Sequence, residues 1–291
     1  MSLENLVGLN LEKITPARQT AVRLLRSCVT FLVGFIAANG RAETTIPLEI
    51  RQGNVLARAA INRVPLKLVI DLGGLGSLSL KADAIARTGV APLPATISQT
   101  DALGNTAERR TFNVSTLELG NGVFRDITAH EVGGYAASGA GDGLIGRDFL
   151  KRFVVVFDYP SRVVTLYSPQ ERKAADRACG GDLVPTIPDP DGIIVSVATS
   201  DHGPLRMLWD TGASYSFVKA AVAAQRHLPV QGETYRTRHF ALGARDFGPL
   251  ELVSLALKEP ANVDGYIGYN FFASHVVCVD ALGAQTLVRV K

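Results

Sequence analysis

Two aspartates in this sequence each end an apolar segment and are followed by a glycine-containing turn. Asp71 lies in LKLVIDLGGLGSLSL, residues 66–80, and Asp210 lies in RMLWDTGASYSFVKA, residues 206–220. A carboxylate at the end of an apolar strand is partly removed from water, so its protonation state can be tuned by its surroundings. The glycine two residues later lets backbone N–H groups approach that carboxylate with no Cβ in the way.

Two such turns facing each other would form a hydrolytic pair. Like charges held a few Å apart cannot both ionise, so the two carboxyls would share one proton near the working pH. The ionised aspartate could deprotonate a trapped water while the protonated one polarises a peptide carbonyl. Because the two titrate as one coupled unit, neither has a fixed individual role.

An internal repeat indicates that the two turns belong to two similar units. DGLIGRDFLKRFVVVFD at 142–158 aligns without a gap on DGYIGYNFFASHVVCVD at 264–280, with eight identical residues 122 positions apart. The repeated aspartates within these segments are predicted to support turns rather than to act in catalysis. A single Asp-Thr-Gly is more often a simple turn motif; its duplication favours a functional pair.

Each copy has the same predicted order of elements: strand, Asp turn, helix, long hairpin region, Gly-x-Ile-Gly and strand. The helices are predicted at residues 81–88, closed by Gly89, and at residues 218–226. Hairpins are predicted to turn at residues 62–63 and 158–161. The stretch 169–191, rich in charge, Gly and Pro, is predicted to link the copies. We therefore expect a unit at 43–168 and a second unit at 192–291.

The paired Asp turns, each followed by an apolar-Gly segment (Leu144-Ile145-Gly146 and Tyr266-Ile267-Gly268), resemble those of the pepsin and retropepsin-like aspartic peptidases. The arrangement resembles that of bacterial exported proteases with two tandem retropepsin-like domains, and the resemblance covers roughly residues 46 to 291. The resemblance implies an all-β, bilobal acid-protease fold, with two similar β-barrel-like lobes and a cleft between them.

The resemblance also implies the roles of individual residues. Asp71 and Asp210 would be the catalytic pair of an aspartic endopeptidase, supported by Gly73, Thr211 and Gly212. No cofactor and no metal would be needed. The substrate would be an extended peptide or protein segment, and a single chain that holds both lobes would be complete as a monomer.

Members of this family cover the cleft with a β-hairpin flap. Asp71 to Gly143 spans 72 positions whereas Asp210 to Gly265 spans 55, so the first copy has the longer excursion. We expect the flap at residues 98–112, and its turn, Leu103-Gly104-Asn105, is a candidate substrate-binding segment.

The first turn departs from the family pattern, because Leu72 stands where Thr or Ser is usual. A leucine cannot make the cross-turn hydroxyl bond that Thr211 can make, and a lost bond of this kind costs about 0.5–1.5 kcal/mol. Two interpretations follow: an active peptidase with a loosened pair, or a catalytically impaired peptide-binding or scaffold protein.

The first 42 residues have the pattern of a secretory signal. A basic flank precedes an apolar run from Cys28 to Ala38, and Gly40-Arg41-Ala42 follows. The run is shorter than the roughly 20 apolar residues of a transmembrane helix. We expect export to the periplasm or beyond, with cleavage after Ala42 or with the segment retained as an anchor, and no stable membrane insertion of the mature chain.

The remaining sequence is electrically balanced and lacks the motifs of several other enzyme classes. Without the leader, 25 basic and 25 acidic residues remain (30 − 5 and 27 − 2), which gives no electrostatic case for binding nucleic acid. The five histidines lack metal-ligand spacing, and no Gly-x-Ser-x-Gly elbow is present. Gly74 and Gly76 lack the third glycine of a dinucleotide-binding loop. Cys179 and Cys278 could form a disulfide in an oxidising compartment or stay as buried thiols.

Overall fold

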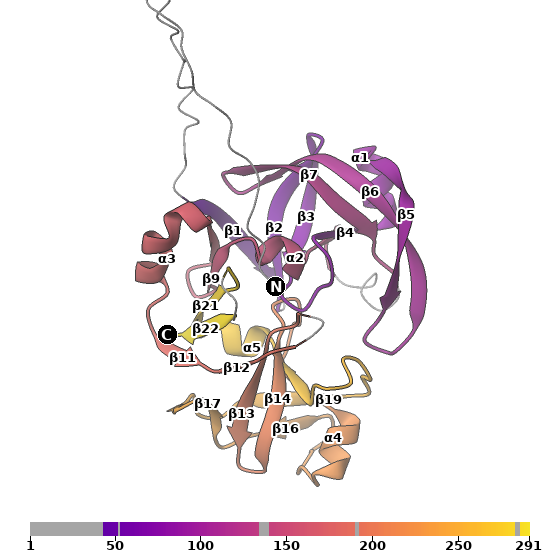
Figure 1. Cartoon of the computed structure of the whole chain (residues 1–291). Coiled ribbons are helices and arrows are strands. Elements are labelled where there is room, and N and C mark those ends of the chain that lie inside the picture. Colours follow the sequence, from indigo (N-terminus) through magenta and orange to yellow (C-terminus); the bar gives the residue numbers. More distant parts are fainter. Residues whose placement is uncertain (1–42, 52, 134–139, 190–191, 283–285) are drawn as a thin grey trace, which may run out of the picture. The chain divides into compact units, whose positions relative to one another are not determined.

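The computed structural model describes residues 43–51, 53–133, 140–189, 192–282 and 286–291 (Figure 1). The predicted signal segment, 1–42, lies outside the described residues. Strands hold 51% of the described residues and helices 13%, so this part of the chain is mostly β, and its strands form two sheets.

One part of the larger sheet is a band of six antiparallel strands to which both sequence copies contribute. In spatial order these are β11 (Asp182–Val184), β22 (Leu287–Val290), β21 (Val276–Asp280), β9 (Val154–Asp158), β10 (Val163–Tyr167) and β1 (Thr44–Arg51). The central pair, β9 and β21, consists of the two repeated segments. Val154 faces Asp280, and Asp158 faces Val276. In the repeat, residue 154 corresponds to residue 276 and residue 158 to residue 280. The two pairs are therefore equivalent, and β9 and β21 meet with local twofold symmetry.

The rest of the larger sheet belongs to the first copy. Six strands form a ring, which closes because β6 pairs with β2. The ring strands are β2 (Asn54–Ile61), β3 (Val64–Ile70), β8 (Gly143–Ile145), β4 (Leu78–Leu80), β7 (Gly122–Glu131) and β6 (Thr106–Leu119). Strand β5 (Ala91–Thr100) pairs with β6 at the edge. The short helices are α1 (Ala82–Thr88) and α2 (Arg147–Leu150).

The second copy forms the nine-stranded sheet with two short helices, α4 (Ala220–Gln225) and α5 (Tyr269–Phe272). Its strands are β16 (Thr234–Arg236), β19 (Glu251–Leu255), β15 (Phe217–Lys219), β20 (Gly265–Ile267), β14 (Gly203–Trp209), β13 (Val195–Ser200), β17 (Phe240–Leu242), β18 (Arg245–Asp246) and β12 (Thr186–Ile187). Strand β20 lies between β14 and β15 as β8 lies between β3 and β4. In both copies the middle strand is parallel to the first and antiparallel to the second.

Several predicted local features are present. Helix α1 ends at Gly89, which has a left-handed φ of 59°, and β2 turns into β3 through Asn62 and Arg63, both at positive φ. The second helix begins two residues later than predicted, because residues 218–219 belong to β15. The segment predicted as a linker carries a 3-10 turn (Pro169–Glu171), α3 (Arg172–Ala178) and the strands β11 and β12.

The repeated aspartates Asp142 and Asp264, directly before β8 and β20, hold equivalent positions. Each carboxylate accepts a backbone N–H from the neighbouring strand and pairs with an arginine at the end of the copy's helix. The contacts are Lys67 N to Asp142 Oδ2 at 2.7 Å, Arg206 N to Asp264 Oδ2 at 2.9 Å, Arg87 with Asp142, and Arg226 Nη2 to Asp264 Oδ2 at 3.0 Å. The two arginines are 139 positions apart, as Asp71 and Asp210 are. These carboxylates therefore support turns, as expected.

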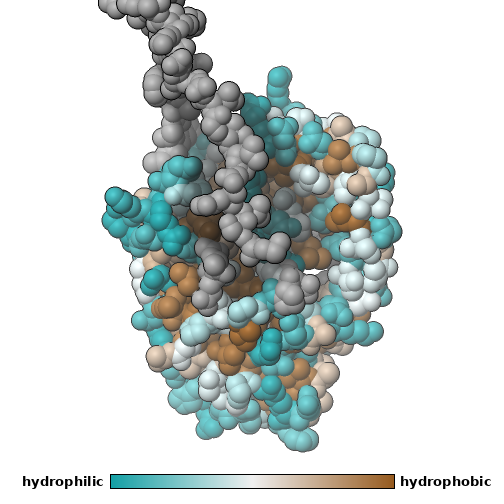
Figure 2. Space-filling model, in the orientation of Figure 1, coloured by the Kyte–Doolittle hydropathy of each residue, from teal (hydrophilic) through white to brown (hydrophobic). Residues whose placement is uncertain are grey.

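No described helix is long and apolar enough to cross a membrane. The face drawn in Figure 2 carries separate brown, apolar patches among teal and white residues. The largest fully buried side chains are aromatic and include Trp209, Phe157 and Phe271.

Cys179, directly after α3, is joined to Cys278 of β21 by a disulfide with a Cα–Cα distance of 5.3 Å. Of the two possibilities left open by the sequence, the structure has the disulfide. It closes a separation of 99 residues and fastens α3 to the central band. Because a cross-link restricts the unfolded chain, and more so for a long loop, this one should contribute substantially to stability.

We expect replacement of both cysteines, Cys179→Ala with Cys278→Ala, to lower the free energy of unfolding by about 2–4 kcal/mol. Urea denaturation followed by circular dichroism measures this. A reducing agent should destabilise the wild type by a similar amount and leave the double variant unchanged. A double variant as stable as the oxidised wild type would contradict the prediction.

Candidate active site

Asp71 and Asp210 occupy equivalent places in the two copies. Each follows the last residue of a strand, β3 or β14, and its N–H donates to the last carbonyl of the middle strand. These bonds are Asp71 N to Ile145 O at 2.8 Å and Asp210 N to Ile267 O at 3.0 Å. Because the middle strand separates the two outer ones, the chain must cross the end of that strand after each aspartate. The Asp turn is this crossing.

Each carboxylate is fixed by N–H groups of its own turn. Asp71 Oδ1 accepts from Gly73 N at 2.8 Å. Asp210 Oδ1 accepts from Gly212 N at 2.9 Å and from Ala213 N at 3.0 Å. These bonds orient the carboxyl groups and favour their ionised form.

The two turns face each other through their glycines. A Cβ added to Gly73 would lie 2.8 Å from Asp210 Cγ, and one added to Gly212 would lie 2.6 Å from Asp71 Cγ. Neither position leaves room for a side chain, so each glycine backbone lies directly against the opposite carboxyl. The two carboxyls are close enough that each shifts the pKa of the other. The structure thus brings together four of the five residues predicted for the pair and its support.

The surroundings of the two carboxyls favour a shared proton. Burial raises the pKa of Asp71, and the hydrogen bonds from Asp210 and from turn N–H groups oppose that rise. Burial, followed by the charge of Asp71, raises the pKa of Asp210 well above its ordinary value. Both residues remain only partly buried, so water can reach them. We therefore expect the pair to keep one proton at a pH where isolated carboxyls have lost theirs.

Thr211, the fifth predicted residue, ties the second turn to the first. Its side chain is buried, and its Oγ1 accepts from Leu72 N at 2.9 Å and donates to Ile70 O at 2.8 Å. Leu72 is also buried but is apolar, so its side chain cannot return an equivalent bond. One hydroxyl thus joins the ends of two strands that are 139 residues apart.

The glycine of each apolar-Gly segment packs beneath the Asp turn. A Cβ on Gly146 would approach the carbonyl oxygens of residues 74–76 within 2.5–3.0 Å. A Cβ on Gly268 would lie 2.2 Å from Tyr215 O and 3.0 Å from Ala213 O. Any side chain at either position would push the turn out of place, which explains the repeated Gly-x-Ile-Gly.

Two further residues near the pair were not predicted from the sequence. Arg147 is buried, and its guanidinium donates to Gly73 O at 3.3 Å, which braces the first turn. Tyr159 is buried close enough to the pair that burial, followed by the charge of Asp71, raises its pKa. The only sequence signal for Arg147 was its position directly after Gly146; Tyr159 carried none.

The predicted turn at Leu103-Gly104-Asn105 lies at the tip of the hairpin formed by β5 and β6. Gly104 has a φ of 85°, and Asp101 N donates to Asn105 O at 2.9 Å. The carbonyl of Ala102 accepts hydrogen bonds from the loop after β19, as described below. The hairpin thus extends from the first copy to the second, and Figure 1 shows its tip near the loop that follows β19.

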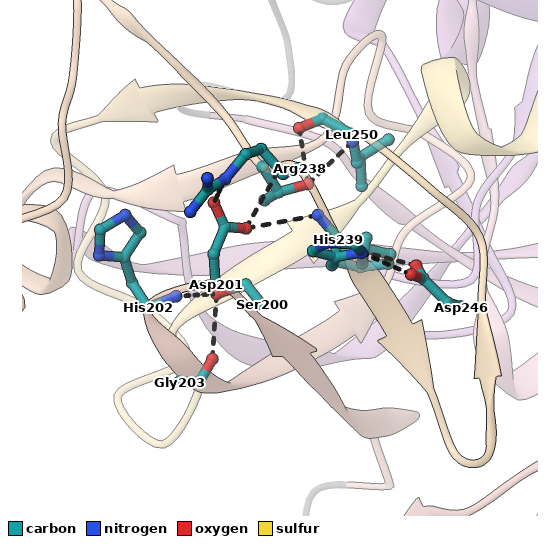
Figure 3. Close-up of polar contacts among 10 residues, drawn as sticks. Ser200, Asp201, His202, Gly203, Arg238, His239, Asp246 and Leu250 are labelled. Carbon is teal, nitrogen blue, oxygen red and sulfur yellow. Dashed lines mark hydrogen bonds and ion pairs between the residues drawn. The ribbon is translucent and has the colours of Figure 1, made fainter.

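A second polar cluster lies in the nine-stranded sheet (Figure 3). Asp201 accepts from Arg238 N at 3.0 Å, and His239 Nδ1 lies 2.7 Å from Asp246 Oδ2. The first bond joins the β13–β14 turn to the segment before β17, and the second joins that segment to β18, so both have a structural role. Across the described residues, no group of three or more His, Cys, Asp or Glu side chains could hold a metal ion.

No family model matches the chain, and no curated protein is significantly similar to it. The functional assignment therefore depends on the site itself.

We expect Thr211→Val to destabilise the protein by about 1–3 kcal/mol, because it leaves the buried Leu72 N–H without its acceptor. Thr211→Ser, which keeps the hydroxyl, is the matched control and should lose less than half as much. Chemical denaturation of the two variants beside the wild type measures the difference. A loss in Thr211→Val no larger than that in Thr211→Ser would contradict the prediction that the hydroxyl bonds provide most of the stabilisation.

Proposed function

We propose that the protein is an aspartic endopeptidase with the bilobal fold of the pepsin and retropepsin-like enzymes, and that Asp71 and Asp210 are its catalytic pair. The observation that carries this proposal is the reciprocal close approach of the two turns, in which each glycine lies against the opposite carboxyl. Such an arrangement costs stability, because it holds two acids together away from bulk water. A purely structural pair of turns has no need of it.

In the proposed reaction the ionised aspartate removes a proton from a water held between the carboxyls, and the water oxygen attacks the peptide carbonyl carbon. The protonated aspartate gives its proton to the carbonyl oxygen, so a neutral gem-diol forms. Collapse of this intermediate breaks the C–N bond. The aspartate that took the water proton delivers a proton to the leaving nitrogen, and a hydroxyl proton returns to the other aspartate. No redox step and no cofactor is required.

The substrate we propose is an extended peptide segment that lies between the pair and the β5–β6 hairpin. An extended chain can pair its backbone with a neighbouring strand edge, and alternate side chains then meet the protein on opposite sides. The disulfide supports the proposal that the protein works in an oxidising compartment such as the periplasm.

A second candidate function is supported by Leu72. With a leucine in the first turn, only one hydroxyl links the turns, so the pair is less constrained than it would be with two. The alternative is a peptide-binding or scaffold protein with an impaired pair. It predicts binding of extended peptides without cleavage.

We expect wild-type protein to cleave an unfolded protein substrate between acid and neutral pH, and Asp71→Asn or Asp210→Asn to reduce the rate by about 10³-fold or more, since the shared proton is lost. A statine-type transition-state analogue should inhibit the wild type. Mass spectrometry of the products measures cleavage. The control is Asp126→Asn, the same chemical change at an exposed aspartate of β7 with a φ of 53°, and it should retain activity.

If the folded wild type cleaves nothing at any pH but retains peptides on a binding assay, the scaffold alternative replaces the peptidase. If both Asp→Asn variants cleave as fast as the wild type, the pair is not catalytic.

A further inference from the structure

Lys219, at the end of β15, is buried although its side chain carries an ammonium group. Its Nζ donates to Lys258 O at 2.9 Å and to Pro260 O. Burial lowers its pKa. Burying an ammonium group costs free energy unless its N–H groups donate hydrogen bonds. The Lys219 ammonium donates its hydrogen bonds to the carbonyls of one short loop.

The same loop, Lys258–Pro260, is held at a third point by Tyr266. The Tyr266 hydroxyl donates to Glu259 O, and its ring stacks on Phe217 with a centroid distance of 4.2 Å. Three consecutive carbonyls are therefore fixed by side chains from β15 and β20. Strand β15 follows the second Asp turn, and β20 is the middle strand whose end that turn crosses.

The backbone N–H groups of this loop meet the tip of the β5–β6 hairpin. Lys258 N and Glu259 N both donate to Ala102 O, at 2.9 and 3.2 Å. In addition, a Cβ on Gly104 would lie 3.2 Å from Lys258 Cδ. The loop carbonyls thus accept hydrogen bonds from side chains of the second copy. Two adjacent N–H groups of the same loop donate to the hairpin tip of the first copy.

We propose that loop Lys258–Pro260 is a docking site for the hairpin tip, and that Lys219 and Tyr266 position this loop so that the hairpin closes over the Asp pair. This inference rests on the proposed peptidase function for its kinetic consequence, but the docking contact itself does not. Two hydrogen bonds are few enough to break for substrate entry and product release, and sufficient to favour the closed hairpin once a peptide is bound.

Lys219 is accordingly a positioning residue that acts through the loop and does not touch the reacting atoms. Its counterpart in the first copy is Lys81: Lys219 N donates to Asp264 O and Lys81 N donates to Asp142 O, each at 2.9 Å. Lys81→Met is therefore the matched control. It removes a lysine from the equivalent backbone position of the first copy and leaves Lys219, which contacts loop Lys258–Pro260, in place.

The test uses the full chain and measures hydrogen exchange at the amides of residues 258 and 259 by mass spectrometry with single-residue resolution. One variant replaces the tip residues 102–105 with Asn-Gly, which removes the Ala102 carbonyl while keeping a two-residue turn. The other is Lys219→Met. Both should speed exchange at these amides by about tenfold, the effect of losing two ordinary hydrogen bonds, and Lys81→Met should not.

Kinetics give the second readout. If the protein cleaves peptides, Lys219→Met should raise KM by about tenfold with a smaller change in kcat, because the hairpin no longer closes firmly on bound substrate. Wild-type exchange rates at residues 258 and 259 in the shortened-hairpin variant would overturn the docking proposal even if the protein is a peptidase. Faster exchange in a protein that cleaves nothing would keep the docking site and reject the proposed function.

Discussion

The arrangement of this protein depends on one contact: two carboxyls placed against each other, each backed by the glycine of the opposite turn. Held together and partly dry, Asp71 and Asp210 repel each other when both are ionised, so the surrounding structure must hold them. It does so with the strand pairing before each turn, the glycines beneath the turns and the hydroxyl of Thr211. The β9–β21 pair joins the two copies, and the disulfide fastens α3 to this band.

The two copies are not equal, and the differences gather at the first turn. Ser79 faces Leu144 eight residues after its aspartate, whereas Phe217 faces Tyr266 seven residues after the other, so the first turn is one residue longer. This turn also has Leu72 in place of a hydroxyl residue. The brace from Arg147 to the carbonyl of residue 73 is an added support on this side. The second turn supplies the hydroxyl link, and the first copy supplies the hairpin.

Structural features that are determined by residues close together in the sequence could be predicted from it. The gapless repeat, the apolar segments before each aspartate, the helix end at Gly89 and the hairpin turn around Gly104 all depend on neighbouring residues and on backbone angles that favour glycine. The contacts of Lys219 with its loop and of the Tyr159 ring with Tyr269 were not predictable, because each joins residues far apart in the chain through a single side chain. A lone buried lysine or tyrosine has no periodicity to reveal it. The disulfide was one of two open possibilities, because sequence alone did not place Cys179 beside β21.

The central claim, that the two carboxyls hold one proton jointly, can be tested without any substrate by carbon-13 NMR titration of protein labelled at the aspartate carboxyl carbons. We predict two coupled steps for the wild type, one of them above the ordinary aspartate range, because burial and the neighbouring charge raise the pKa of Asp210. Asp71→Asn should remove the coupling and leave a single step for Asp210. Two independent titrations near the ordinary aspartate pKa, unchanged by Asp71→Asn, would contradict the account.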